Sequence, residues 1–145
     1  MSDRNSIAAG WIVIVLILCQ FIPLDRTNPP SGNPAGIPSD VRAVLKAHCY
    51  RCHSNETKWP PSAYIAPLSW IVVREVHEAR NALNFSNYQD KPVALRSAVN
   101  CRIHKIANSG NLTSHDGIPG FQQIRMTGQE RRLLLDWTSD NNCEP

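Results

Sequence analysis

The sequence predicts a small all-α domain with long loops, preceded by one apolar N-terminal helix. Residues 7–24 carry no charge, apolar residues recur at helical spacing in later segments, and no stretch alternates like a β-strand. The chain has 145 residues, 42% of them hydrophobic, so one folded domain is expected. The net charge is +3, from 15 Lys and Arg against 12 Asp and Glu. Without a long basic run, this charge argues against a nucleic-acid partner.

The apolar run over residues 7–24 is the first predicted element. As a helix it would be about 27 Å long, close to the thickness of a bilayer core. The sequence therefore predicts a transmembrane anchor at 7–24, with residues 1–6 as a cytoplasmic tip. A cleaved signal peptide is the alternative, but no small-x-small cleavage pattern follows the run. The flanking Arg4 and Arg26 do not decide the orientation.

After the apolar run, residues 25–38 are rich in proline, which is typical of an extended, semi-rigid spacer. The folded domain is expected over 39–145. Its first predicted helix starts at Ser39 or Asp40 and ends before Cys49. Further helices are predicted after Pro67, after Pro92 and after Thr127, where Thr127 and Glu130 have the capping-box spacing.

Residues 49–53 read Cys-Tyr-Arg-Cys-His, and this C-x-x-C-H spacing is the attachment sequence for c-type haem. Thiols three residues apart can reach the two vinyl groups on one porphyrin edge, and His53 is then placed as the proximal iron ligand. The prediction is one covalently attached haem c, held by Cys49, Cys52 and His53 in a domain like that of a small c-type cytochrome. A zinc site is the alternative, but its second ligand pair could come only from Cys101 and His104.

Covalent haem attachment takes place on the outer side of the bacterial inner membrane. We therefore expect a single-pass inner-membrane protein whose haem domain faces the periplasm or the exterior. Of the five cysteines, Cys19 lies in the apolar run, and haem uses Cys49 and Cys52. Cys101 and Cys143 remain, and in an oxidising compartment we expect them to form a disulfide, with two free thiols as the alternative.

Three segments resemble the signature of the haem-binding-domain family of single-haem c-type cytochromes. They are residues 52–60 (CHSNETKWP), residues 65–70 (IAPLSW), and Arg80 followed by residues 83–86 (LNFS). The resemblance covers residues 23–88 closely and the C-terminal helix loosely. It implies an anchored, periplasm-facing haem protein with an electron-transfer or haem-binding role.

The chain departs from that family at the sixth iron ligand. Relatives often carry a Gly-x-Met-Pro-Pro segment before the last helix, whereas residues 110–115 here read GNLTSH, and a leucine cannot ligate iron. The candidate distal ligands are His115 in this loop and Met126 before the last helix. His77 and His104 are interpreted as solvated side chains. A five-coordinate or water-bound iron is the remaining alternative.

The favoured function is electron transfer by a membrane-anchored monohaem cytochrome on the periplasmic side, to or from a membrane redox complex. This interpretation favours a carrier over an enzyme. Trp59 and Tyr64 are expected to pack against the haem, with an ordinary core position as the alternative. The alternative functions are a five-coordinate haem sensor, a peroxidase-like protein, and a haem-containing accessory subunit of a larger complex.

Overall fold

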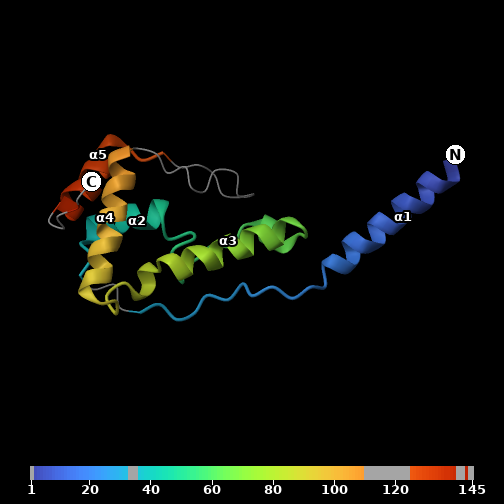
Figure 1. The fold of residues 1–145 in the computed structure, drawn as a ribbon, viewed down its shortest axis with the longest axis horizontal. Helices are drawn as coiled ribbons and strands as arrows, with labels where there is room; N and C mark the ends of the chain where they lie inside the picture. Colours follow the sequence, from blue (N-terminus) through green and yellow to red (C-terminus); the bar gives the residue numbers. More distant parts are fainter. Residues whose placement is uncertain (1, 33–35, 110–124, 140–142, 144–145) are drawn as a thin grey trace.

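The structure is a computed structural model that describes residues 2–32, 36–109, 125–139 and 143 (Figure 1). Within these ranges every regular element is a helix, so the all-α part of the predicted fold class is confirmed there. The elements are α1 (Ser2–Cys19), α2 (Ser39–His48), η1 (Pro61–Tyr64), α3 (Leu68–Ala82), η2 (Phe85–Asn87), α4 (Val93–Ser109) and α5 (Gly128–Thr138).

The prediction of a transmembrane helix over residues 7–24 is wrong. None of the helices in the described ranges combines the length and the apolar character needed to cross a membrane. α1 takes in the polar residues 2–6 and ends at Cys19, so the helical part of the apolar run is residues 7–19. This part is roughly 20 Å long, against about 30 Å for a bilayer core. The predicted single-pass inner-membrane localisation depended on this helix and is corrected with it.

The other predicted helices occur where the sequence places them. α2 covers the residues between the predicted cap and Cys49, α3 follows Pro67, and α4 follows Pro92. α5 begins with the predicted capping box: the Thr127 hydroxyl oxygen accepts from the Glu130 N–H at 3.2 Å, and the Glu130 carboxylate accepts from the Thr127 N–H at 2.7 Å.

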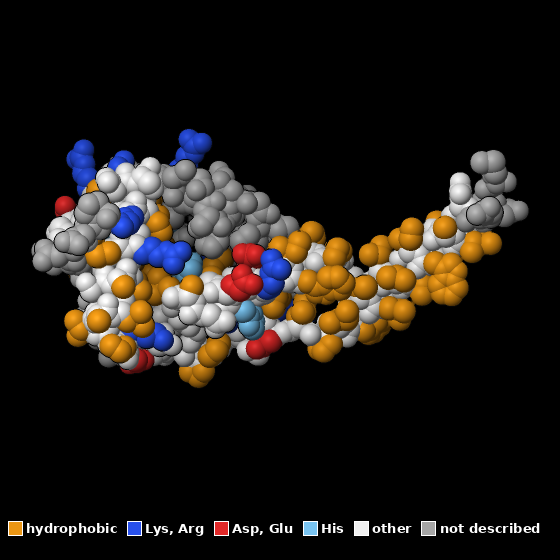
Figure 2. All heavy atoms as spheres, in the orientation of Figure 1, with side chains coloured by type: hydrophobic (Ala, Val, Ile, Leu, Met, Phe, Trp, Pro, Cys, Tyr) orange, Lys and Arg blue, Asp and Glu red, His pale blue; other side chains and the backbone are white. Residues whose placement is uncertain are grey.

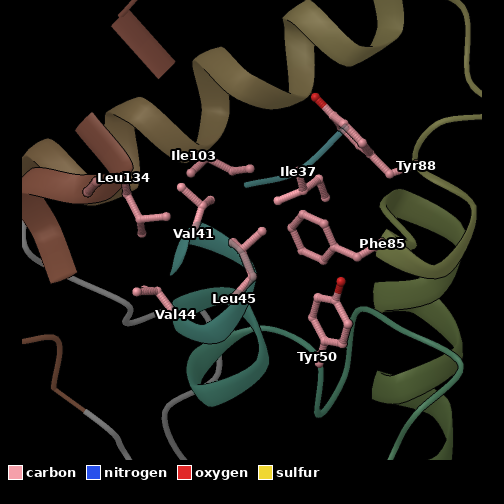
Figure 3. Close-up of a cluster of buried hydrophobic side chains, with 10 residues drawn as sticks. Ile37, Val41, Val44, Leu45, Tyr50, Phe85, Tyr88, Ile103 and Leu134 are labelled. Atoms are coloured by element: carbon pink, nitrogen blue, oxygen red, sulfur yellow. The ribbon is translucent and has the colours of Figure 1, made fainter. Parts of the chain in front are cut away.

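The main core lies between α2, α4, α5 and the aromatic residues that follow α2 and α3 (Figure 3). α5 packs against both α4 and α2. Leu45 of α2 is fully buried, with aliphatic side chains of α4 and α5 on one side and the Tyr50 and Phe85 rings on the other. The buried members are Ile37, Val41, Val44, Leu45, Tyr50, Phe85, Tyr88, Ile103, Ala107 and Leu134.

The described parts of the proline-rich segment are residues 25–32 and 36–38, and neither carries a helix or strand. Residues 25–32 run along the domain below α3 (Figure 1). Hydrogen bonds join it to the domain: the Asn28 side chain donates to the Thr57 carbonyl at 2.9 Å, and Arg80 donates to the Thr27 carbonyl at 2.9 Å. The proline-rich segment therefore lies against the folded domain and is joined to it by these hydrogen bonds.

A disulfide joins Cys101 in α4 to Cys143, with 5.2 Å between the two Cα atoms. Its sequence separation is 42 residues, so it links the chain beyond α5 back to the middle of α4. Cys19, Cys49 and Cys52 are free cysteines.

Candidate haem site

The C-x-x-C-H segment, residues 49–53, starts where α2 ends. Cys49 is the C-cap residue of α2, and its N–H donates to the Leu45 carbonyl at 2.7 Å. Two further N–H groups, those of Cys52 and His53, donate to the Cys49 carbonyl at 3.2 and 2.9 Å. The segment is therefore one compact turn, hereafter the C-x-x-C-H turn, with Cys49 half-buried and Cys52 buried.

Contacts with later residues hold the far end of this turn. The Ser54 hydroxyl donates to the Tyr50 carbonyl at 2.7 Å and accepts from the Glu56 N–H at 2.9 Å. The Phe85 N–H donates to the His53 carbonyl at 2.8 Å, and the Phe85 ring stacks on the Tyr50 ring with 5.5 Å between centroids. The turn is thus fixed both by its own backbone and by the segment that follows α3.

His53 is oriented by the last turn of α3. Its Nδ1 lies 3.0 Å from the Ala79 carbonyl oxygen and 3.1 Å from the Leu83 carbonyl oxygen. Because carbonyl oxygens only accept, Nδ1 carries the hydrogen and Nε2 carries the lone pair. Metal-binding histidines are commonly fixed in this way, by a hydrogen bond from the ring nitrogen that does not face the metal.

The two thiols of the turn are protonated at neutral pH. Burial raises the pKa of the Cys49 thiol to about 12 and that of the Cys52 thiol to about 11. A zinc site or a redox nucleophile uses thiolates, which these surroundings disfavour. The zinc alternative also loses Cys101, which is in the disulfide. In the ranges that the structure describes, no group of three or more His, Cys, Asp or Glu side chains could hold a metal ion.

Cys49, Cys52 and His53 of the C-x-x-C-H turn fit a haem. The turn presents one imidazole whose lone pair is on Nε2 and two neutral thiols that precede it by one and four residues. An iron porphyrin supplies four equatorial nitrogens itself, so the protein needs to add only axial ligands and, in c-type proteins, two thiols.

The structure places the two predicted haem-packing aromatics differently. Trp59 is half-buried and packs in a small apolar cluster with Cys52, Val76 and Ala79. Tyr64 is 58% exposed, and its ring lies under the guanidinium of Arg26 at 4.8 Å. Trp59 is therefore brought next to the C-x-x-C-H turn, whereas Tyr64 is at the surface.

The candidate distal ligands are also placed differently. His115 lies outside the described residues. Met126 is half-buried and packs against the main core cluster, which Cys49 also contacts. His77 and His104 form hydrogen bonds elsewhere, to a backbone carbonyl at 2.8 Å and to a threonine hydroxyl at 2.9 Å.

Arg80 is the site residue whose role the sequence analysis missed. Its guanidinium donates to four oxygens around the turn and the proline-rich segment and lies 5.6 Å from the Trp59 ring centroid. The acceptors are the Ser54 carbonyl at 2.8 Å, the Thr27 carbonyl at 2.9 Å, the Asn28 amide oxygen at 2.6 Å and the Thr57 hydroxyl at 2.9 Å. Two of these are backbone carbonyls, which leave no pattern in a sequence.

A domain whose described elements are all helices, with one such turn and an oriented histidine, is typical of a small haem protein. The family model of the haem-binding domain matches residues 14–140. The chain therefore belongs to the haem-binding-domain family, and it is a haem-binding protein. No curated protein and no solved structure matches the chain.

Proposed function

We propose that the protein is a monohaem c-type cytochrome that carries electrons. Cys49 and Cys52 would hold one haem covalently, and Nε2 of His53 would be the proximal iron ligand. When bound, the haem supplies one-electron chemistry through its ferric and ferrous states.

The orientation of His53 is the observation that carries this proposal. Its Nδ1–H donates to the Ala79 and Leu83 carbonyls, which selects the tautomer and restrains the ring. Such a hydrogen bond also raises the basicity of Nε2, the ligating nitrogen. A ligand restrained by backbone groups keeps one position in both oxidation states, which suits an electron carrier.

Cys49 and Cys52 would form the two thioether bonds. Each bond would result from net addition of one S–H to one vinyl group, so that no oxidant or reductant would be consumed.

The proposed distal ligand is either His115 or Met126. A methionine ligand would raise the reduction potential above that of a bis-histidine haem. Met126→Leu and His115→Ala separate the two, because replacing the true ligand converts the low-spin ferric spectrum to high-spin and replacing the other does not.

A redox protein, alone or in a multisubunit complex, is the proposed partner. An electron carrier has to exchange its electron with a second redox centre, and this chain offers one haem-attachment turn. The partner therefore has to supply the other centre.

Attachment is tested on protein purified from cells that mature c-type haem. We expect haem to stay with the polypeptide in acidified acetone, at one haem per chain by intact mass and pyridine haemochrome absorbance. Cys49→Ala and Cys52→Ala should each leave one vinyl group unsaturated, whereas Cys19→Ala, which removes the free cysteine of α1, should behave as wild type. Release of the haem by acetone from the wild-type protein would show that the attachment is not covalent.

Ligation is tested by electron paramagnetic resonance of the ferric protein. We expect a low-spin signal for the wild type, and we expect His53→Ala to abolish it. His77→Ala, the control substitution of a histidine on α3, should preserve the signal. A high-spin wild-type signal with rapid binding of CO or cyanide would contradict the carrier and indicate a five-coordinate sensor or a peroxidase-like protein.

A further inference from the structure

The Arg80 guanidinium donates hydrogen bonds to neutral oxygens: two backbone carbonyls, one side-chain amide and one hydroxyl. The ion pairs among the described residues do not include Arg80, since their basic members are Lys46, His48 and Arg74. Arg80 therefore carries a positive charge that no carboxylate of the described residues neutralises through an ion pair.

The carboxylate that acts on Arg80 from a distance is that of Asp25. Burial lowers the pKa of Arg80 and Asp25 raises it, and an arginine in a protein stays protonated in either case. Asp25 is exposed, and its carboxylate accepts from the Thr27 N–H at 2.8 Å. Because water and salt screen an exposed carboxylate, Asp25 offsets the charge of the half-buried Arg80 only in part.

The charge of Arg80 acts on Cys52 of the C-x-x-C-H turn. Burial has the largest influence on the pKa of this thiol and raises it. Among charged side chains, Arg51 and Arg80 lower the pKa of Cys52, and Glu75 raises it. Two cations and one carboxylate thus act on a side chain that would hold the haem, so the local excess of charge is positive.

Glu75, the carboxylate of this group, has a different cation as its ion-pair partner. Its Oε1 lies 3.2 Å from Nη2 of Arg74, whose Nε lies 3.5 Å from Oε1 of Glu78. Figure 2 shows Asp and Glu side chains over the middle of α3 with a Lys or Arg side chain beside them. Arg80 is in the last turn of the same helix. The acids of α3 are thus paired with Arg74, and the charge of Arg80 remains.

Arg80 is also linked to both sides of His53. Ala79, the residue before Arg80, provides a carbonyl that accepts from His53 Nδ1 at 3.0 Å. The Arg80 Nε–H donates to the carbonyl of Ser54, the residue after His53, at 2.8 Å. These two links hold the guanidinium in one position relative to the proposed proximal ligand.

We propose that the charge of Arg80 raises the reduction potential of the haem. This inference rests on the proposed function and specifies how its haem site is tuned. A ferric haem carries one more positive charge than a ferrous haem, so a fixed cation nearby disfavours the ferric form. The effect is larger at a partly buried site than in water, because the effective dielectric constant is lower there.

Two substitutions at Arg80 separate its charge from its hydrogen bonds. Neither Arg80→Lys nor Arg80→Gln has the planar fork, but Lys keeps the positive charge. In a mediated redox titration of the holo-protein, we expect the equilibrium constant for one-electron reduction to be about tenfold lower for Gln than for Lys, equivalent to about 59 mV. A purely structural role would move both variants together. Equal potentials for the two variants would overturn the inference.

Glu75 gives a test of opposite sign that leaves the hydrogen bonds of Arg80 in place. Glu75→Gln removes the carboxylate that acts on Cys52 and should raise the equilibrium constant for reduction about threefold. Glu78→Gln is the matched control, since Glu78 is exposed and also pairs with Arg74, and should change it about 1.5-fold or less. A lowered potential for Glu75→Gln, or equal shifts for the two variants, would overturn the inference.

Denaturation of the ferric and ferrous forms provides a readout that does not use electrochemistry. Relative to Arg80→Lys, Arg80→Gln should shift the folding equilibrium of the ferric form over that of the ferrous form by the same factor of about ten. No such shift would overturn the inference.

The failure of this inference can be distinguished from failure of the proposed function. If the wild type is high-spin or takes up no electron from the mediator, the carrier function itself fails. If the wild type and the variants titrate reversibly with low-spin spectra and Arg80→Lys and Arg80→Gln have equal potentials, only the role of the Arg80 charge fails.

Discussion

The C-x-x-C-H turn and the α4–α5 pair are held in different ways. The turn is fixed by hydrogen bonds, chiefly to backbone carbonyls and to the Arg80 guanidinium. The α4–α5 pair is held mainly by apolar packing and by the disulfide between Cys101 and Cys143, with two hydrogen bonds between the helices, one between His104 and Thr138 and one from Arg131 to the Asn108 carbonyl. Directional bonds set the orientation of a ligand such as His53, whereas packing and a covalent link set only which helices stay together.

This difference has a consequence for function. A residue whose ring is fixed by two carbonyls presents one nitrogen in one direction, as an axial ligand requires. We therefore predict that removing hydrogen bonds at the C-x-x-C-H turn perturbs the turn and not the α4–α5 pair. Removing the disulfide should destabilise the α4–α5 pair and leave the turn unchanged.

The largest expected effect follows removal of the disulfide. With a sequence separation of 42, Cys101→Ser with Cys143→Ser should lower the free energy of unfolding by about 4 kcal/mol in the chain-entropy treatment. Guanidinium denaturation of the holo-protein followed by circular dichroism measures the loss, with Cys19→Ser as the control. The haem absorbance spectrum should stay unchanged before unfolding, and a changed spectrum would show that the two regions depend on each other.

Arg80 offers the converse test in the turn. Arg80→Ala removes a guanidinium that donates to four oxygens and should lower the free energy of unfolding by about 3 kcal/mol. Arg80→Lys should recover only part of this, since an ammonium lacks the planar fork.

The matched control for Arg80→Ala is Arg74→Ala on the same helix. Arg74 is exposed and pairs with the half-buried Glu75 and the exposed Glu78, and its replacement should cost about 0.5 kcal/mol or less. Both the free energy of unfolding and the ferric spectrum are measured for each variant. We expect Arg80→Ala to change the ferric spectrum, because it alters how His53 would ligate the iron, and Arg74→Ala to leave the spectrum unchanged. Equal costs for the two variants would contradict the role given to Arg80.

The sequence predicted those parts of the fold that depend on neighbours in the chain. Helix starts after Pro67 and Pro92 and the capping box at Thr127 are local patterns, and each occurs in the structure. The end of α1 at Cys19 was missed, because hydrophobicity continues to Leu24 and hydropathy alone does not report where a helix ends.

The site was predictable in its residue types but not in its orientation. The C-x-x-C-H spacing identified His53, yet the carbonyls of Ala79 and Leu83 that fix its ring are backbone atoms at the C-terminal end of α3, 26 and 30 residues away. Likewise, proline content predicted an extended segment over residues 25–38, but contact with the domain depends on hydrogen bonds to Arg80, which composition does not encode.

A smaller effect is expected at the start of α5. Thr127→Ala removes the hydroxyl that accepts from the Glu130 N–H and should lower the free energy of unfolding by about 1 kcal/mol. Thr127→Ser keeps an acceptor and should cost less. A cost for Thr127→Ser as large as that for Thr127→Ala would show that the hydroxyl is not the stabilising group.

The smallest effect is the pH dependence of the same cap. The Thr127 N–H, followed by the His48 side chain and the Thr127 hydroxyl, holds the pKa of Glu130 below its usual value. Because the folded-state pKa is the lower one, the carboxylate contributes its stability above the unfolded-state pKa of about 4.5, and this contribution is lost as pH falls through the folded-state pKa. Glu130→Gln retains an acceptor for the Thr127 N–H but does not titrate. We therefore expect the wild type to exceed Glu130→Gln in free energy of unfolding at pH 7 and the difference to shrink toward zero at pH 3. A difference that is the same at both pH values would mean that the ionised carboxylate adds nothing beyond a neutral cap.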